Sequence, residues 1–392
     1  MACLQGSWHT SQTATADPSL TTPRLKKAPG APCVQDDILC QPNQSGRSSS
    51  RPADNPLSAA YLSFLPLRLC CYTQRAKGTT LTTPLTRREV LVGTAATVAA
   101  AQFSAPLWGA DAHDRPGVQL YMLGAEMRKD AAGTLAKLAA IGYGYVEAFS
   151  MNIGQNASLD VAGFKKSLAD AGLGCPSGHF PFGFVATEKA LDDASALGVK
   201  FAVSSVLPPE PPKGAEIMAV MQKMNHLTAD DFKRMAALAN QIGESAGRHG
   251  LEYAYHNHNI EFRKLDSGET GYDILLKETD PKLVKLEVDA GWMAAGGADT
   301  VGLIAANANR VRLLHFKDFS TITPPINELG GAASGHIVDL GTGVVPLKAA
   351  YRAARKAGVK YFIVDHDPPF QGKTALEAAK VDYDYVAGLM AS

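Results

Sequence analysis

The feature that most constrains the fold is a repeated alternation of short apolar runs and longer amphipathic runs, which starts at Gly117. The longer runs have helical periodicity, and one of them carries an N-cap threonine, Thr228, and a terminal glycine, Gly250. Eight strand-helix alternations in about 280 residues predict a single-domain (β/α)8 TIM barrel over residues 113–392. The predicted strands are residues 117–123, 143–149, 174–180, 199–205, 251–257, 283–289, 311–317 and 361–365.

A doubly wound open sheet would show the same alternation and is the structural alternative. An open nucleotide-binding sheet carries a G-x-G-x-x-G motif after its first strand, and no such motif follows residues 117–123. The sequence therefore favours the closed barrel.

The part of the chain before the barrel has two segments. Residues 1–80 are rich in Ser, Thr, Pro and Gln without sustained periodicity, which predicts a disordered region or an artefact of the assigned gene start. In residues 81–112 the twin arginines Arg87 and Arg88 precede a short apolar run and an A-x-A sequence at 110–112. This layout resembles a twin-arginine (Tat) signal peptide, although an exposed arginine pair before a core helix is the alternative. The signal predicts an exported, periplasmic protein with no stable membrane anchor after cleavage.

The charge balance argues against a nucleic-acid partner. The chain has 38 Lys and Arg residues and 38 Asp and Glu residues, so its formal net charge is zero. Proteins that bind nucleic acid usually carry a basic face. We therefore predict a small-molecule partner and no nucleic acid.

Six of the predicted strands carry polar side chains at or just beyond their C-terminal ends, where (β/α)8 barrels place their catalytic groups. In the fifth strand, alternation puts His256 on the same face as Ala254 and His258, so that small and polar groups can point toward the barrel axis. The polar residues at the strand ends are Glu147, His179, His256, Asp289, His315, Lys317, Asp365 and Asp367.

Each of the last four strands supplies a nitrogen or oxygen ligand to the same rim. Imidazole together with carboxylate suits one divalent ion, Mn²⁺, Zn²⁺, Fe²⁺, Co²⁺ or Ni²⁺, better than Ca²⁺ or Mg²⁺. The alternative is a set of rim residues that satisfy one another by hydrogen bonds without a metal.

Five motifs, IGYGYVEAF, YHNHNIEF, LEVDAGW, LLHFKD and GVKYFIVDHD, resemble in this order the sugar phosphate isomerase/epimerase family of xylose isomerase-like TIM barrels. The resemblance covers residues 117–390. It implies one divalent metal ion held by residues on strands five to eight, and proton transfer next to the carbonyl of a small sugar substrate. The implied metal ligands are His256, Asp289, His315 and Asp365.

Two positions depart from the family pattern. His256 and Asp365 stand where the family has glutamates that are thought to act as acid and base. We therefore take Glu147, His179 and Lys317 as the catalytic candidates, with Lys317 as the group that stabilises an enediolate oxygen. The candidates for substrate binding are His258, Trp292 and Asp367.

Several of these residues have a structural alternative. Glu147 could form a salt bridge with Lys317, and His258 could orient His256. The Gly-rich segment 320–343 is long for a barrel connection and could be a lid over the rim, or a contact between the subunits of a homo-oligomer.

These observations predict a metal-dependent isomerase or epimerase that acts on a sugar or keto-sugar. The replaced glutamates make a lyase that dehydrates 3-keto glycosides or inososes the first alternative. A non-catalytic exported sugar-binding barrel is the second. Hydrolysis of nucleic acid, as in endonuclease IV, would need a basic groove, which the charge balance does not favour.

Overall fold

The computed structural model describes residues 114–149, 159–210, 217–329 and 331–392. The predicted disordered region 1–80 and signal segment 81–112 lie outside the described residues. Within the described part of the chain, no helix is both long enough and apolar enough to cross a membrane.

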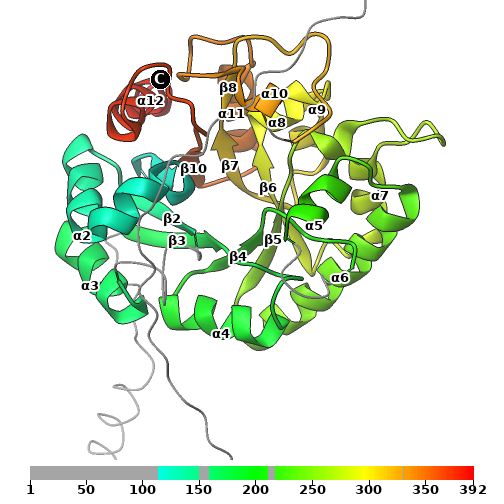
Figure 1. Ribbon diagram of the computed structural model, residues 1–392, viewed down its shortest axis with the longest axis horizontal. Helices are drawn as coiled ribbons and strands as arrows, with labels where there is room; N and C mark the ends of the chain where they lie inside the picture. Colours follow the sequence, from blue (N-terminus) through cyan, green and yellow to red (C-terminus); the bar gives the residue numbers. More distant parts are fainter. Residues whose placement is uncertain (1–113, 150–158, 211–216, 330) are drawn as a thin grey trace, which may run out of the picture. The chain divides into compact units, whose positions relative to one another are not determined.

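Eight parallel strands close into a barrel in the order β1-β10-β7-β6-β5-β4-β3-β2 (Figure 1). The pairing of β1 with β10 leaves no free edge, which confirms the predicted (β/α)8 barrel and excludes the open doubly wound sheet. The strands are β1 (Gly117–Gln119), β2 (Tyr145–Phe149), β3 (Gly174–His179), β4 (Phe201–Ser204), β5 (Glu252–His256), β6 (Val284–Asp289), β7 (Val311–Phe316) and β10 (Tyr361–Val364).

The first strand is shorter than predicted. It ends at Gln119, and the predicted residues beyond it form the 3-10 helix η2 (Leu120–Leu123). The Gln119 side-chain oxygen accepts a hydrogen bond from the Tyr121 backbone N–H, which turns the chain at this point. Leu120, Met122 and Leu123 are buried in this 3-10 helix, as they would be in a strand, so their apolar character does not distinguish the two structures.

Helices surround the barrel (Figure 1). The predicted N-cap at Thr228 is confirmed, because its hydroxyl accepts from the Asp231 backbone N–H while the Asp231 carboxylate accepts from the Thr228 N–H. The helices are α2 (Gly124–Ile141), α3 (Val161–Ala171), α4 (Thr187–Leu197), α5 (Ile217–Met224), α6 (Ala229–Arg248), α7 (Gly271–Glu278), α8 (Ala290–Ala295), α9 (Thr300–Ala306), α10 (Gly331–Ser334), α11 (Leu347–Lys356) and α12 (Ala375–Met390), with a second 3-10 helix, η4 (Ile260–Phe262).

The barrel interior changes from apolar to polar along the strands. Alternation places Tyr145 two residues before Glu147 on β2, and Leu313 two residues before His315 on β7, on the same inward faces. The apolar part is a buried cluster of Tyr145, Phe201, Val203, Ala254, Leu313, Tyr361 and Ile363. This cluster closes the barrel below the polar residues.

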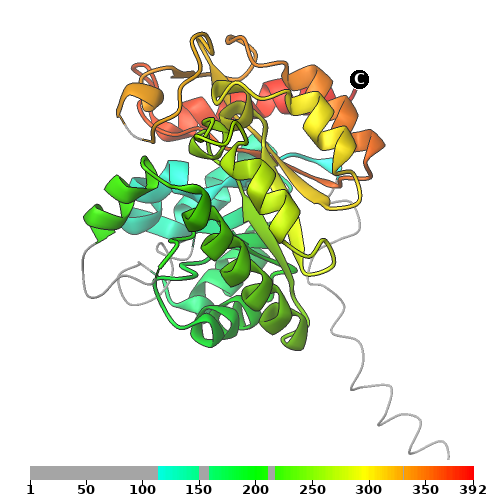
Figure 2. The ribbon, with the colours of Figure 1, turned by 90° about the vertical axis from the view of Figure 1, so that its right-hand side faces the viewer.

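The segment between β7 and β10, orange in Figure 2, lies at one end of the barrel unit. It folds around a small antiparallel pair, β8 (Asp318–Phe319) and β9 (Ile337–Val338). The Asn259 side-chain amide donates to the carbonyls of Ile326 and Glu328, at 2.9 and 3.0 Å, and so fastens the segment to the residues that follow β5.

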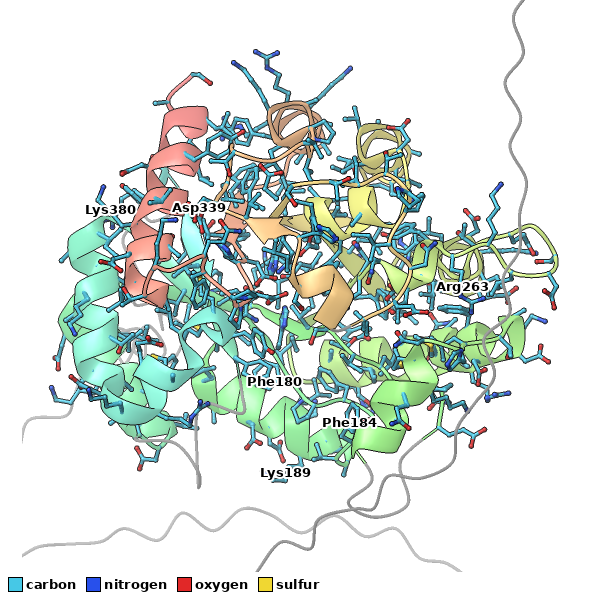
Figure 3. The ribbon with its side chains drawn as sticks, turned by 45° about the horizontal axis from the view of Figure 1, so that its top comes forward. Phe180, Phe184, Lys189, Arg263, Asp339 and Lys380 are labelled. Atoms are coloured by element: carbon cyan, nitrogen blue, oxygen red, sulfur yellow. The ribbon has the colours of Figure 1, made fainter. Side chains whose placement is uncertain are left out.

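Asp339, at the end of this segment, lies beside α12 (Figure 3). Its carboxylate is 2.8 Å from the Lys373 ammonium. The neighbouring Leu340 N–H donates to Asp382 of α12, and Asp382 also pairs with His366 at 2.8 Å. The segment is therefore tied to the C-terminal helix as well as to the mouth of the barrel.

Candidate active site

The structure gathers the predicted site residues at the C-terminal end of the barrel. His179, His256 and Asp289 are the last residues of β3, β5 and β6. Lys317 and Asp365 directly follow β7 and β10. The remaining predicted residues lie in other parts of the barrel strands or in the segments that follow them: Glu147 in β2, His315 in β7, His258 after β5, Trp292 in α8 and Asp367 after β10.

Two buried glutamates, Glu147 of β2 and Glu287 of β6, lie within the strands, and we call them the carboxylate floor. Neither is exposed to solvent. Glu287 Oε2 accepts hydrogen bonds from His179 Nε2 at 2.8 Å and pairs with His256 Nδ1 at 2.9 Å. Glu147 Oε2 lies 3.1 Å from His179 Nε2 and 2.8 Å from His315 Nε2.

These short contacts around Glu147 lack hydrogen-bond alignment. Both Glu147 oxygens, Glu287 Oε1 and His315 Nε2 are buried without a hydrogen-bond partner among the described residues. Burial raises the pKa of Glu147, but the attraction of His179 and His315 outweighs it and holds that pKa well below its usual range. Glu147 is therefore a buried anion.

His179 contacts Gln119 of β1. The Gln119 Nε2 amide lies 3.0 Å from His179 Nδ1. Because the Gln119 oxygen already accepts the Tyr121 N–H, the amide presents its N–H groups to the histidine, whose Nδ1 must then be an acceptor. The single proton of a neutral His179 consequently sits on Nε2, facing the carboxylate floor. Burial lowers the pKa of His179, whereas Glu147 and Glu287 outweigh this and raise it to about 10.

Lys317 lies at the mouth of the barrel between two carboxylates. Its ammonium is fully buried, 3.0 Å from Asp367 Oδ2 and 3.2 Å from Asp365 Oδ2, and 5.4 Å from the centre of the Trp292 ring. Burial lowers its pKa, but Asp365 and Asp367 outweigh burial and raise the pKa above its usual value. The anticipated pair between Glu147 and Lys317 does not form, because Glu147 lies among the histidines below.

His258 and Trp292 form one wall of the mouth. Their ring centres are 5.8 Å apart, and the His258 ring also lies 5.0 Å from that of His256. Burial and the repulsion of Lys317 lower the pKa of His258 to about 3, so its imidazole is neutral at physiological pH. A neutral ring beside an indole suits contact with the carbon face of a polyhydroxylated ligand.

Two overlapping groups of side chains could hold a metal ion. The predicted ligands His256, Asp289, His315 and Asp365 each offer one ligand atom, and these atoms lie within 4.8 Å of one another. A second group with the same spacing consists of His179, His256, Glu287 and His315. The donor atoms fit a divalent cation, because Asp289 Oδ2, Glu287 Oε1 and His315 Nε2 are buried without a hydrogen-bond partner in the described structure.

Sequence reasoning missed Glu287 and Gln119. Glu287 comes two residues before Asp289, so strand alternation puts both side chains on the inward face. Glu287 was overlooked because only the last residue of each strand was considered. Gln119 was hidden by the expectation that β1 continues to residue 123.

The comparisons with known proteins agree with this geometry. The family model for the xylose isomerase-like TIM barrel matches residues 135–381. A sugar phosphate isomerase/epimerase from Parabacteroides distasonis superposes with a TM-score of 0.55 and 25% identity, over 70% of this chain and 93% of that chain.

Curated relatives match over shorter stretches. The chain is 26% identical over 178 residues to an inosose dehydratase of Lacticaseibacillus casei, which is 41% of this chain and 57% of the relative. It is 32% identical over 102 residues to an inosose dehydratase of Bacillus licheniformis, which is 25% of this chain and 32% of the relative. The chain thus spans little more than half the length of the first of these relatives.

The family model covers well over half of the chain, and the closed barrel is the architecture that the family description names. The chain therefore belongs to the xylose isomerase-like TIM barrel family.

Proposed function

We propose that the protein is a divalent-metal-dependent lyase that removes water from a small polyhydroxylated ketone, either a keto-cyclitol of the inosose type or a 3-keto sugar. The observation that carries the proposal is the pair of Lys317 and Asp367 at the mouth of the barrel. Asp367 is a partly exposed carboxylate, with a side chain that is 20% exposed, and the ammonium of Lys317 lies beside it. A base and a cation on one side of the substrate suit enolisation followed by elimination.

The residues of the chain supply the proton transfers. Burial raises the pKa of Asp367 against the opposing attraction of Lys317, which makes it a better base than an ordinary surface aspartate. In the proposed reaction Asp367 takes the proton from the carbon next to the carbonyl, and Lys317 stabilises the enolate oxygen. The enolate electrons then expel the hydroxyl on the neighbouring carbon. The proton on Asp367 leaves with that hydroxyl as water, so both residues return to their starting state.

A divalent ion bound next to His256 and His315 would polarise the substrate carbonyl and its neighbouring hydroxyl. His258 and Trp292 would contact the carbon face of the substrate ring. The inosose dehydratases among the curated relatives support this branch of the chemistry.

Isomerisation is the second candidate, and the Parabacteroides distasonis neighbour favours it because that protein is described as an isomerase/epimerase. It would start from the same enolate, with the proton returned to carbon. Epimerisation needs an acid and a base on opposite faces, and His256 stands where the family has one of its two glutamates. This substitution favours elimination.

We also propose that the substrate carries no phosphate. The export predicted from residues 81–112 would remove the enzyme from the cytoplasmic sugar phosphates. The Lys317 ammonium at the mouth of the barrel is already paired with Asp365 and Asp367. A phosphate would compete with both carboxylates for it.

The test incubates the full-length, metal-loaded protein with inosose, a 3-keto glucoside and ketoses in D₂O, followed by mass spectrometry and NMR. A product lighter by one water supports the lyase. Deuterium in a recovered sugar, or in its epimer, without loss of water would support isomerisation and refute elimination. Turnover of no substrate, with saturable binding, would favour a binding protein.

Variants of Asp367 and Lys317 test the catalytic roles proposed for these two residues. Asp367→Asn and Lys317→Met should each lower kcat by about 10²-fold or more, because each removes a group that acts in the transition state. Lys380→Met is the matched control, since Lys380 lies on the surface of α12 (Figure 3), paired with Asp384. Full activity in the Asp367→Asn variant would remove Asp367 as the base.

A further inference from the structure

We propose that two buried carboxylates, Asp318 and Asp382, are positioning residues that fix Lys317 and Asp367 relative to each other. Asp318 directly follows Lys317 in the chain, and Asp382 lies on α12. The proposal rests on the roles of Lys317 and Asp367 in the proposed function. It identifies the part of the structure that holds these two groups in place.

The Asp318 carboxylate lies at the centre of a turn. It is 1% exposed and accepts four hydrogen bonds from the backbone. The donors are the N–H groups of Phe319, Gly341, Gly343 and Val345, at 2.9 to 3.1 Å. A Cβ on Gly343 would lie 2.2 Å from Asp318 Oδ1, which shows how closely the turn surrounds the carboxylate. Asp318 therefore fastens residues 341–345 to the segment that follows β7.

These contacts restrict the backbone of Lys317, the residue before Asp318. Helix α8 restricts the same backbone, because a Cβ on Gly291 would lie 2.3 Å from the Lys317 carbonyl oxygen. The ammonium at the far end of this side chain lies 3.0 Å from Asp367 Oδ2. Because the lysine side chain is long, a small rotation of its backbone displaces the ammonium much further than the Cα. Asp318 thus sets the position of the cation through the backbone.

Asp382 connects the same turn to Asp367. It is completely buried, Oδ1 accepts from the Leu340 N–H at 2.8 Å, and Oδ2 pairs with His366 Nδ1 at 2.8 Å. Leu340 is next in the chain to a backbone partner of Asp318, and His366 directly precedes Asp367. One carboxylate on α12 therefore holds both the turn and the segment that carries the proposed base.

These contacts form one continuous path, which we call the outer network: Asp318, the turn 340–343, Asp382 and His366. One end of the outer network adjoins Lys317 in the chain, and the other adjoins Asp367. The three side chains are at most 1% exposed, so water does not readily replace a hydrogen bond that is lost. A displacement of 1 Å at a reacting group can lower a rate by about 100-fold. The outer network is therefore placed to determine how well the base and the cation work together.

Two variants of the full-length protein test the outer network, Asp318→Asn and Asp382→Asn. Each keeps the size of the side chain but replaces one of the two acceptor oxygens by an amide nitrogen, which cannot accept. Asp384→Asn is the matched control, because Asp384 is exposed on the same helix and pairs with Lys380 outside the network. Circular dichroism and thermal unfolding report folding and Tm. If one network variant does not fold, the other decides.

The first measurement needs no substrate. Sulfo-N-hydroxysuccinimide acetate acetylates accessible lysine amines, and peptide mass spectrometry gives the rate at Lys317 relative to the exposed Lys189 of α4 (Figure 3). In the parent, Lys317 should react slowly because its side chain is completely buried. In each network variant its relative rate should rise by about tenfold or more, because lost hydrogen bonds make local opening more frequent. Asp384→Asn should match the parent.

The second measurement compares kcat and KM of the metal-loaded proteins on the substrate that the parent dehydrates. We expect kcat to fall by about tenfold or more in each network variant while KM changes by less than about threefold, because the displaced cation acts on the enolate in the transition state. A lower Tm with the acetylation rate and kcat of the parent would overturn the proposal, since the network would then be structural alone. Faster acetylation with unchanged kcat would also overturn it.

The proposed function can fail separately. If the parent dehydrates no substrate, the proposed reaction is wrong and acetylation of Lys317 alone decides. Faster acetylation in the network variants would then support the outer network as the support of Lys317, and the rate of the parent would overturn it.

Discussion

Glu261 gives a prediction whose size follows from the structure. It lies in η4 with 1% of its surface exposed, where Oε1 accepts from the Tyr255 hydroxyl at 2.8 Å and Oε2 from the His258 backbone N–H at 3.0 Å. Burial raises its pKa from 4.5 to about 7, although these hydrogen bonds oppose the shift. The folded state therefore holds this proton more tightly than the unfolded state.

The sign of the pH dependence follows from linkage. Where the folded pKa is raised, the stabilisation is complete below the unfolded value near 4.5 and is lost as the pH rises through about 7. A shift of about 2.5 units corresponds to a total loss of about 3 kcal/mol in the free energy of unfolding, most of it between roughly pH 5 and pH 8.

Glu261→Gln isolates this contribution, because it mimics the protonated carboxyl. The glutamine oxygen can accept the His258 N–H, and its amide can donate to the Tyr255 hydroxyl. Urea unfolding of the parent and the variant at a series of pH values should show that the parent loses about 2.5 kcal/mol relative to the variant between roughly pH 5 and pH 8. The exposed Glu269→Gln is the control for the loss of one charge. A difference between parent and Glu261→Gln that does not change with pH would refute the burial argument.

Three further predictions concern the metal, the mouth of the barrel and the N-terminus of helix α6. Removal of the metal by a chelator should lower the Tm by about 8 °C relative to protein with metal at about 1,000 times Kd, because such binding stabilises the folded state by about 4 kcal/mol. A Tm that does not respond to the chelator would contradict a bound ion. Gly291→Ala should lower the free energy of unfolding by about 1–3 kcal/mol and reduce turnover, because a Cβ at this position would lie 2.3 Å from the backbone oxygen of Lys317. Unchanged stability in thermal or urea unfolding, with unchanged activity, would refute this close approach. Thr228→Ala should cost about 1 kcal/mol in urea unfolding through loss of the capping box with kcat unchanged, and an altered kcat would show that α6 influences the site.

The sequence was sufficient to predict the barrel, because strand-helix alternation is a local signal. Strand alternation also predicted that His256 faces the axis. Neither signal reports the height of a residue along the axis, which depends on how neighbouring strands are staggered. Glu147 pairs in register with Gln119 and Ser177, and that stagger puts it below the histidines instead of at the rim. For the same reason Glu287, which pairs with His256 and Leu313, was overlooked in favour of the last residue of its strand.

The height of these residues also separates their chemical roles. A carboxylate at the floor is buried, with apolar side chains below it and histidines beside it. Asp367, whose side chain is 20% exposed, lies closer to solvent at the mouth of the barrel, where it forms an ion pair with the buried Lys317.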